Sequence, residues 1–148
     1  MGFLRAALMW LVVGTLLGAS MASRPSLAWM RPAHLHALLL GFVMMMIAGV
    51  AYHVIPRFAM VALHAPRLAL AHLVIANVGL VLMVSGFLLR GRGLTIGPAA
   101  LATGGVLSLL GAWAFAWNIW RTLDRAVPVV PVRTGPRRPP MPTAPHAG

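Results

Sequence analysis

Six histidines are the main candidates for chemistry in this chain of 148 residues. The chain has no cysteine, which excludes a disulfide, a thiolate zinc site, a cysteine-held iron–sulfur cluster and a cysteine nucleophile. Its one acidic residue, Asp124, excludes paired-carboxylate catalysis and carboxylate-rich calcium or magnesium sites. Histidine is therefore the abundant side chain that could hold a metal or a cofactor.

The histidines differ in their sequence surroundings. His64 and His146 lie in a predicted link and in a polar tail, where exposed side chains without a special role are expected. The others lie within long apolar segments, where a polar side chain is energetically costly and is therefore a functional candidate. These candidates are His34, His36, His53 and His72, together with Tyr52, Asn77 and Asn118.

Helical periodicity separates the two histidines of the second apolar segment. At about 100° per residue, His36 faces nearly the opposite way from His34 and is not placed to bind the same metal. The residues on the His34 stripe are small or flexible, which suits a flat macrocycle beside its ligand. Close helix packing explains such residues equally well. The stripes are Gly41, Met45, Ala48 and Tyr52 after His34, and Ala76, Gly79, Met83 and Gly86 after His72.

Depth along the helices decides which histidines can share a cofactor. His34 and His53 are 19 residues apart, so about 28 Å separates them along a helix. His72 returns to the level of His53 on the next helix, so His34 and His72 of one chain cannot hold one haem. Two arrangements remain: His53 with His72 in one chain, or His34 with a histidine of another chain. Arg31, one turn before His34, is placed either to pair with a haem propionate or to anchor the membrane interface.

The composition indicates an integral membrane protein. Hydrophobic residues make up 60% of the chain and charged residues only 9%, whereas about a quarter of the residues of a soluble domain are charged. The net charge of +11 does not predict a nucleic-acid partner, because the arginines lie between apolar stretches and in one tail rather than on a polar folded face. The expected partner is the lipid membrane.

Four apolar segments, at residues 3–21, 33–55, 68–89 and 96–120, reach the roughly 20 residues that a membrane-crossing helix requires. The links between them are short, so each helix must run antiparallel to the next. We therefore predict an all-α fold: an integral membrane four-helix bundle, antiparallel and up-down, formed by residues 1–125.

The segment of residues 126–148 holds seven of the twelve prolines and three arginines, without apolar periodicity. Such a segment buries too little surface to offset its ordering entropy. We predict a disordered, Pro/Arg-rich cytoplasmic tail, either solvated or in contact with anionic lipid head groups.

The arginines also predict an orientation. Eight of them share a side with both termini and four lie opposite. The positive-inside rule then places both termini in the cytoplasm, with the protein in the inner (plasma) membrane. In the alternative, Arg5, the first apolar run and the Ser20-Met21-Ala22 triplet form a cleaved secretory signal, which leaves three spans and an external N-terminus.

Residues 31–42 (RPAHLHALLLGF) and 49–57 (GVAYHVIPR) resemble the second helix of haem-copper oxidase subunit I, especially its cbb-type and nitric-oxide-reductase branches and the short four-helix proteins classed with them. Residues 72–83 (HLVIANVGLVLM) resemble the third helix of those short relatives. The resemblance implies that His34 is an axial ligand of a low-spin, b-type haem near the external face. The candidate cofactor site comprises Arg31, His34, His36, Gly41, Tyr52 and His72, and the candidate metal ligands are His34, His53 and His72.

The chain departs from that family in length. A complete catalytic subunit has many more helices, and the later ones carry the second haem ligand and the ligands of the binuclear centre. This chain has room for four helices, so we do not expect it to reduce oxygen or nitric oxide alone. The resemblance leaves enzymatic activity open.

Three functions remain open. In the first, the protein binds haem b in a homodimer or beside a larger respiratory subunit, for electron transfer, haem handling or redox/NO sensing, and copper is not expected. In the second, it is a haem-free structural or assembly subunit of a respiratory complex. In the third, His53, His64 and His72 gather copper or zinc on the cytoplasmic side.

Overall fold

A computed structural model describes residues 1–126, and these residues form helices joined by short links. The predicted tail beyond Ala126 lies outside the described residues. The elements in chain order are α1 (Gly2–Ser23), the 3-10 helix η1 (Pro25–Met30), α2 (Arg31–His36), the π-helix η2 (Ala37–Met44), α3 (Met45–Phe58), α4 (Pro66–Gly91) and α5 (Gly97–Leu123).

Four helical stretches are long and apolar enough to cross a membrane. They are Gly2–Ser23, Pro25–Phe58, Pro66–Gly91 and Gly97–Leu123, and each overlaps one of the four ranges expected from the sequence. The described residues contain no strand. The prediction of an all-α fold with four long apolar helices is confirmed for this part of the chain.

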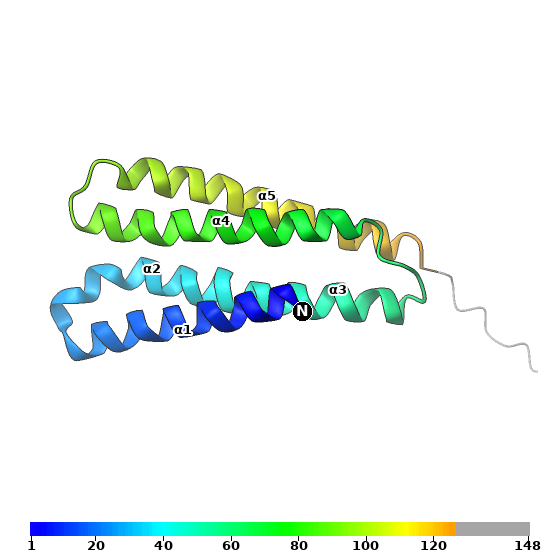
Figure 1. Ribbon diagram of the computed structural model, residues 1–148, viewed down its shortest axis with the longest axis horizontal. Helices are drawn as coiled ribbons and strands as arrows, with labels where there is room; N and C mark the ends of the chain where they lie inside the picture. The colour runs from blue at the N-terminus through cyan, green and yellow to red at the C-terminus, as the bar shows by residue number, and fades with distance from the viewer. Residues whose placement is uncertain (127–148) are drawn as a thin grey trace, which may run out of the picture.

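The helices form two pairs (Figure 1). In the first pair, α1 packs along the continuous helix α2–η2–α3, and in the second pair α4 packs along α5. The second helix begins beside the end of α1, because a Cβ at Gly18 would lie 2.9 Å from Cε1 of His34. Likewise α5 begins beside the end of α4, where a Cβ at Gly97 would lie 2.5 Å from the backbone nitrogen of Arg90.

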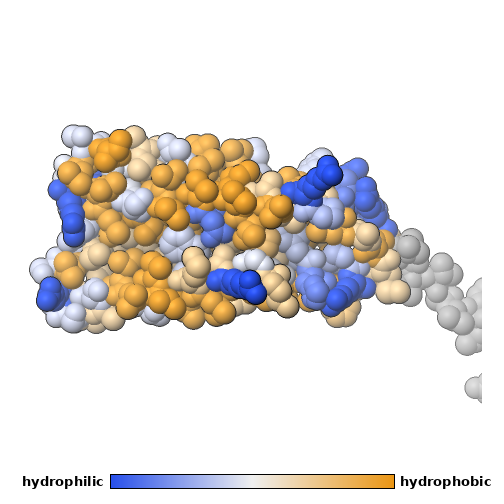
Figure 2. All heavy atoms as spheres, in the orientation of Figure 1, coloured by the Kyte–Doolittle hydropathy of each residue, from blue (hydrophilic) through white to orange (hydrophobic). Residues whose placement is uncertain are grey.

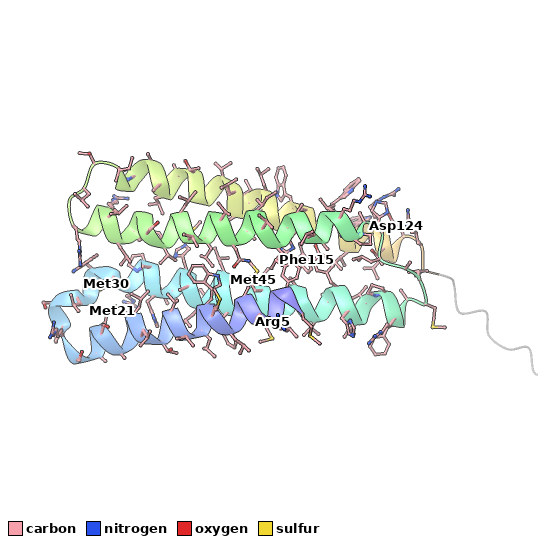
Figure 3. All side chains as sticks on the ribbon, in the orientation of Figure 1. Arg5, Met21, Met30, Met45, Phe115 and Asp124 are labelled. Carbon is pink, nitrogen blue, oxygen red and sulfur yellow. The ribbon has the colours of Figure 1, made fainter. Side chains whose placement is uncertain are left out.

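Helix α1 begins partway along the others, as the position of Arg5 in Figure 3 shows. A Cβ at Gly49 would lie 2.9 Å from Cβ of Phe3, so the first turn of α1 lies beside Gly49. Helix α3 continues from there to Phe58, a further nine residues or about 14 Å. The ends of α3, α4 and α5 that carry the α3–α4 link therefore extend beyond α1.

The tightest packing joins α4 to α5, at glycines on both helices. A Cβ at Gly79 would lie 2.8 Å from the backbone nitrogen of Ser108, and one at Gly86 would lie 2.6 Å from that of Leu101. On the opposite helix, a Cβ at Gly104 would lie 2.5 Å from the backbone nitrogen of Met83. Small residues let two membrane helices approach until their backbones touch. The small stripe of the third apolar segment is thus filled by α5, which supports the packing interpretation.

The outer surface is apolar over most of its length. Large hydrophobic side chains of every long helix are exposed, among them Leu16, Leu39, Val74 and Leu109. Figure 2 shows mostly apolar side chains across the central part of one face, interrupted by a hydrophilic patch, and further hydrophilic residues toward both ends. In water such a surface would drive aggregation, whereas this distribution is compatible with a multi-pass membrane protein.

Two side chains of α5 form hydrogen bonds to the α3–α4 link, residues 59–65. The amide of Asn118 accepts from the Ala65 N–H at 2.9 Å and donates to the Ala65 carbonyl at 2.9 Å. The Thr122 hydroxyl accepts from the His64 N–H at 3.0 Å and donates to the carbonyl of Asn118 at 2.7 Å. Asn118 and Thr122 are fully buried, so this polar residue pair inside an apolar helix serves to hold the link.

Gly104→Ala tests the glycine contact between α4 and α5. The added methyl group would overlap backbone atoms of Met83 and Gly79, so we expect the free energy of unfolding to fall by about 1–3 kcal/mol. Thermal unfolding of the purified protein in detergent, followed by circular dichroism, measures this loss. Gly105→Ala is the matched control, because its Cβ would meet only Cε of Met83 at 3.9 Å. Equal losses in the two variants would contradict the packing assignment.

Asn118→Ala tests the link. It leaves the N–H of Ala65 without a partner, while the Ala65 carbonyl still accepts from the N–H groups of Leu68 and Ala69. We therefore expect the free energy of opening the link to fall by about 1–3 kcal/mol. Hydrogen exchange of the His64 and Ala65 amides reports this opening directly. Ser85→Ala serves as the control, because its hydroxyl bonds only to carbonyls of its own helix. Unchanged exchange in Asn118→Ala would show that the amide does not hold the link.

Candidate functional site

His34 belongs to α2, and its partly buried ring packs against α1. Its Nδ1 lies 2.8 Å from the carbonyl oxygen of Gly14, and its ring also contacts Gly18 one turn further along α1. A carbonyl oxygen only accepts hydrogen bonds, so Nδ1 carries a proton, and in the neutral ring Nε2 then has the lone pair. Metal-binding histidines are commonly held in this way, with one nitrogen donating to a backbone carbonyl and the other facing the metal.

The stripe that was expected to follow His34 is different in the structure. Gly41, Met45 and Ala48 do share a buried face, but Ala33 and Ala37 lie at its head. The π-helix η2 (Ala37–Met44) causes the difference. A π-helix has more residues per turn than an α-helix, so the rotation of 100° per residue assumed across this segment was wrong.

That buried face is also closed to a cofactor. A Cβ at Gly41 would lie 2.5 Å from Cγ of Trp10 and 2.9 Å from Cδ2 of Leu80. Trp10 is itself fixed, because its indole N–H donates to Oδ1 of Asn77 at 2.9 Å. Within one copy of the chain, α1 and α4 therefore occupy the space that the macrocycle was expected to fill.

His36 faces a different helix from His34. Its Nδ1 lies 2.8 Å from the carbonyl oxygen of Pro32, in its own first turn, and its ring centroid lies 4.8 Å from that of Phe87 on α4. Arg31 is exposed at the same end of the bundle. The two neighbouring histidines are thus directed to α1 and to α4, and the structure does not bring them together.

His72 is the most buried histidine of the described residues, with 6% of its surface exposed. Its Nδ1 lies 3.1 Å from the hydroxyl oxygen of Tyr52. Rings surround the imidazole, with the centroids of Phe3 at 4.9 Å and of Phe115 at 5.6 Å. Figure 3 shows Phe115 in the region between the two helix pairs. His72 thus joins the first turn of α1 to α3, α4 and α5.

In one of the two arrangements left open by the sequence His72 pairs with His53, but its neighbour in the structure is Tyr52. His53 is exposed and lines a groove of about 530 Å³ between the first turn of α1, α3 and the start of α4. His72 instead lines a small cavity of about 50 Å³ with Met45 and Ser108. Within residues 1–126, no group of three or more histidine or acidic side chains is placed to hold a metal ion. The copper or zinc arrangement of His53, His64 and His72 finds no support in this geometry.

The structure keeps His34 and His72 far apart. His34 contacts Gly14 of α1, whereas His72 contacts Phe3. These two positions are 11 residues apart on α1, or about 16 Å. One haem could not be ligated by both histidines of one chain.

The hydrogen bond between Trp10 and Asn77 is a polar contact that sequence reasoning missed. Asn77 also donates to the carbonyl oxygen of Leu73 at 2.7 Å. A buried indole N–H usually requires a hydrogen-bond partner, so the tryptophan in the middle of the first apolar segment was the available signal. Its partner lies 67 residues away in the sequence, on another helix. Helical periodicity relates only residues of the same helix, so it could not identify this partner.

His64 lies in the link between α3 and α4, outside the long helices. Its Nδ1 is buried and has no hydrogen-bond partner. Burial, with added repulsion from Arg125 and then Arg121, lowers the pKa of His64 from its ordinary value of 6.5. The neutral imidazole is therefore the form that fits the docked link.

The docked link should consequently be sensitive to acid. An imidazole with a lowered pKa in the folded state takes up its proton at higher pH when released. The stability of the link should be complete above about pH 6.5 and should decrease as the pH falls through and below that value. Exchange of the Ala65 amide, corrected for its intrinsic pH dependence, measures this change. His64→Asn should remove the dependence, and an unchanged pH profile in that variant would contradict the assignment.

Comparisons with known proteins leave the family relationship unsupported. No family model matches the chain, and no curated protein matches it. The resemblance of residues 31–57 to subunit I therefore remains a hypothesis, and the function has to be argued from the arrangement of the side chains.

Proposed function

We propose that the chain is an inner-membrane (plasma-membrane) protein whose four long helices form an antiparallel, up-down bundle with both termini in the cytoplasm. Helix α4 carries Arg67 in its first turn and Arg90 in its last. These residues are 23 positions apart, or about 35 Å along the helix, which is slightly more than the roughly 30 Å of a hydrocarbon layer. Exposed apolar side chains cover most of the surface between these two levels, where Arg5 of α1 is the exposed cation, and this predominantly apolar distribution supports membrane insertion.

We further propose that the protein binds b-type haem through Nε2 of His34. The hydrogen bond between Nδ1 of His34 and the Gly14 carbonyl carries this proposal, because it fixes the ring and leaves Nε2 as the lone-pair nitrogen. Arg31 lies one turn earlier at the same end and is exposed, which suits it to a haem propionate. When bound, the haem would supply one-electron chemistry.

The position of the haem in this proposal is the edge of the bundle rather than its interior. Trp10 and Leu80 fill the face at Gly41, so the interior of one copy has no room for the macrocycle there. The second axial ligand would come from the equivalent His34 of another copy or from a larger respiratory partner. The roles that fit such a shared haem are electron transfer, haem handling and redox/NO sensing.

A haem-free structural or assembly subunit is the second candidate, and the same packing favours it. The small residues of the second and third apolar segments meet Trp10, Leu80 and α5, so helix packing alone accounts for them. On this hypothesis, His34→Ala and His72→Ala would leave both the folding of the protein and its association with a partner unchanged.

A pigment spectrum distinguishes the two candidates. After expression with ample haem, the purified protein should show the Soret and split α-bands of a bis-imidazole haem, and His34→Ala should lose them. His36→Ala is the matched control, because its ring bonds within its own turn and faces α4; it should retain the spectrum. Circular dichroism checks that both variants remain folded. A colourless wild-type protein would reject haem binding and favour the structural subunit.

A further inference from the structure

An apolar groove lies on the outer face of α5, at the end of the bundle that carries the α3–α4 link. We call it the tryptophan groove. Its volume is about 660 Å³, and it is lined by Leu68, Trp113, Ala114, Ala116, Trp117 and Trp120. The three indoles are largely exposed, so their rings form walls that no other part of the described chain covers.

The end of the tryptophan groove is cationic. The guanidinium carbon of Arg121 lies 5.7 Å from the ring centroid of Trp117, which holds the arginine beside the groove. Asp124 forms an exposed ion pair with Arg121 at 3.3 Å. Arg125 lies one residue after Asp124 in the sequence. The positive charges of Arg125 and Arg121 both lower the pKa of His64 in the docked link. Two arginines against one acid leave a net positive charge at this end.

The two helices that line the groove are held together by hydrogen bonds beside it. Leu68 lines the groove from the first turn of α4, three residues after Ala65. Ala65 is held by both hydrogen bonds of the Asn118 amide, from the residue next to Trp117. The wall of the groove contributed by α4 therefore keeps its position relative to the tryptophans of α5.

The position along α5 suits an amphiphilic ligand. Trp117 is 20 residues beyond Gly97, the first residue of α5, or about 30 Å along the helix. That length matches a hydrocarbon layer, so Trp117 would lie at the inner interface, where tryptophans are enriched. Arg121 lies one turn further, at the level of lipid phosphates. This step rests on the proposed insertion in the membrane, but not on haem binding.

We propose that the tryptophan groove is a binding site for an anionic phospholipid. One acyl chain lies against Trp113 and Trp117, and the phosphate group lies beside Arg121 and Arg125. Charge complementarity selects this occupant, because the cationic end would not favour a zwitterionic lipid, whose own ammonium group offsets its phosphate. Basic sites between membrane helices on the cytoplasmic side recognise anionic head groups in this manner.

Native mass spectrometry of the full-length protein in detergent tests the proposal, with phosphatidylglycerol and phosphatidylcholine of identical acyl chains as the probes. Phosphatidylglycerol should be retained preferentially. Arg121→Gln should weaken its binding about fivefold, which corresponds to the roughly 1 kcal/mol that one arginine contributes at an anionic surface. Binding of phosphatidylcholine should not change. Equal retention of the two lipids by the wild-type protein would overturn the proposal.

Three variants separate the site from general effects of charge and folding. Asp124→Asn removes the same ion pair as Arg121→Gln but keeps the arginine, so phosphatidylglycerol binding should be unchanged or stronger. Arg24→Gln removes one positive charge at the opposite end and should have no effect. Trp117→Ala should weaken both lipids, because it removes a wall of the groove. A loss in Arg24→Gln or Asp124→Asn equal to that in Arg121→Gln would show diffuse attraction or local unfolding instead of a site.

Two further outcomes would assign this face to something else. If inorganic phosphate displaced phosphatidylglycerol at matched concentration, the site would recognise free phosphate and the groove would play no part. If Trp117→Ala dissociated a dimer without altering lipid binding, the groove would be an interface between two copies. His34→Ala should bind lipid as the wild type does, so a failure of haem binding can be told apart from a failure of this proposal.

Discussion

The close approach of α4 and α5 at their glycines is the contact on which the remaining structure depends. In a lipid environment, apolar side chains gain little by turning inward, so close backbone packing has to supply the association. Gly79 and Gly104 allow this approach, and the resulting pair of helices fixes three things. It presents His72 to Tyr52, it places Asn118 beneath the link at Ala65, and it leaves the tryptophans of α5 on the outside.

The first helix pair is built on a different principle. Trp10 fills the space at Gly41, and its hydrogen bond to Asn77 secures α1 against α4 across the bundle. Such a hydrogen bond is stronger in an apolar medium, because no water competes for the donor or the acceptor. The polar side chains inside the long helices therefore serve two purposes. Asn77 and Asn118 position helices and a link, while Nδ1 of His34 bonds to the Gly14 carbonyl oxygen and leaves Nε2 outside that bond.

Sequence reasoning reached the elements more easily than the site. Length and apolar content fix the number of long helices, and proline and arginine at the links fix their approximate ends, so the all-α class and the four long helices followed directly. The separation of His34 from His72 also followed, because it depends only on the rise per residue. The face of His34 did not, because a π-helix has no composition that distinguishes residues 37–44 from ordinary α-helix. The arrangement that paired His72 with His53 differs from the structure by one position, because Tyr52 is the residue beside His72. Tyr52 and His53 point in different directions, and only packing against Phe3 and Phe115 decides which of them faces His72.

The π-helix between α2 and α3 has a consequence for how this chain can change. It sets a rotational phase between the half of the helix that carries His34 and the half that carries Tyr52. That phase depends on the wide turns of residues 37–44, because the same eight residues in regular α-helical turns would rotate one half against the other. The directions of His34 toward α1 and of His36 toward α4 relative to Tyr52 thus depend on the turn geometry of this segment.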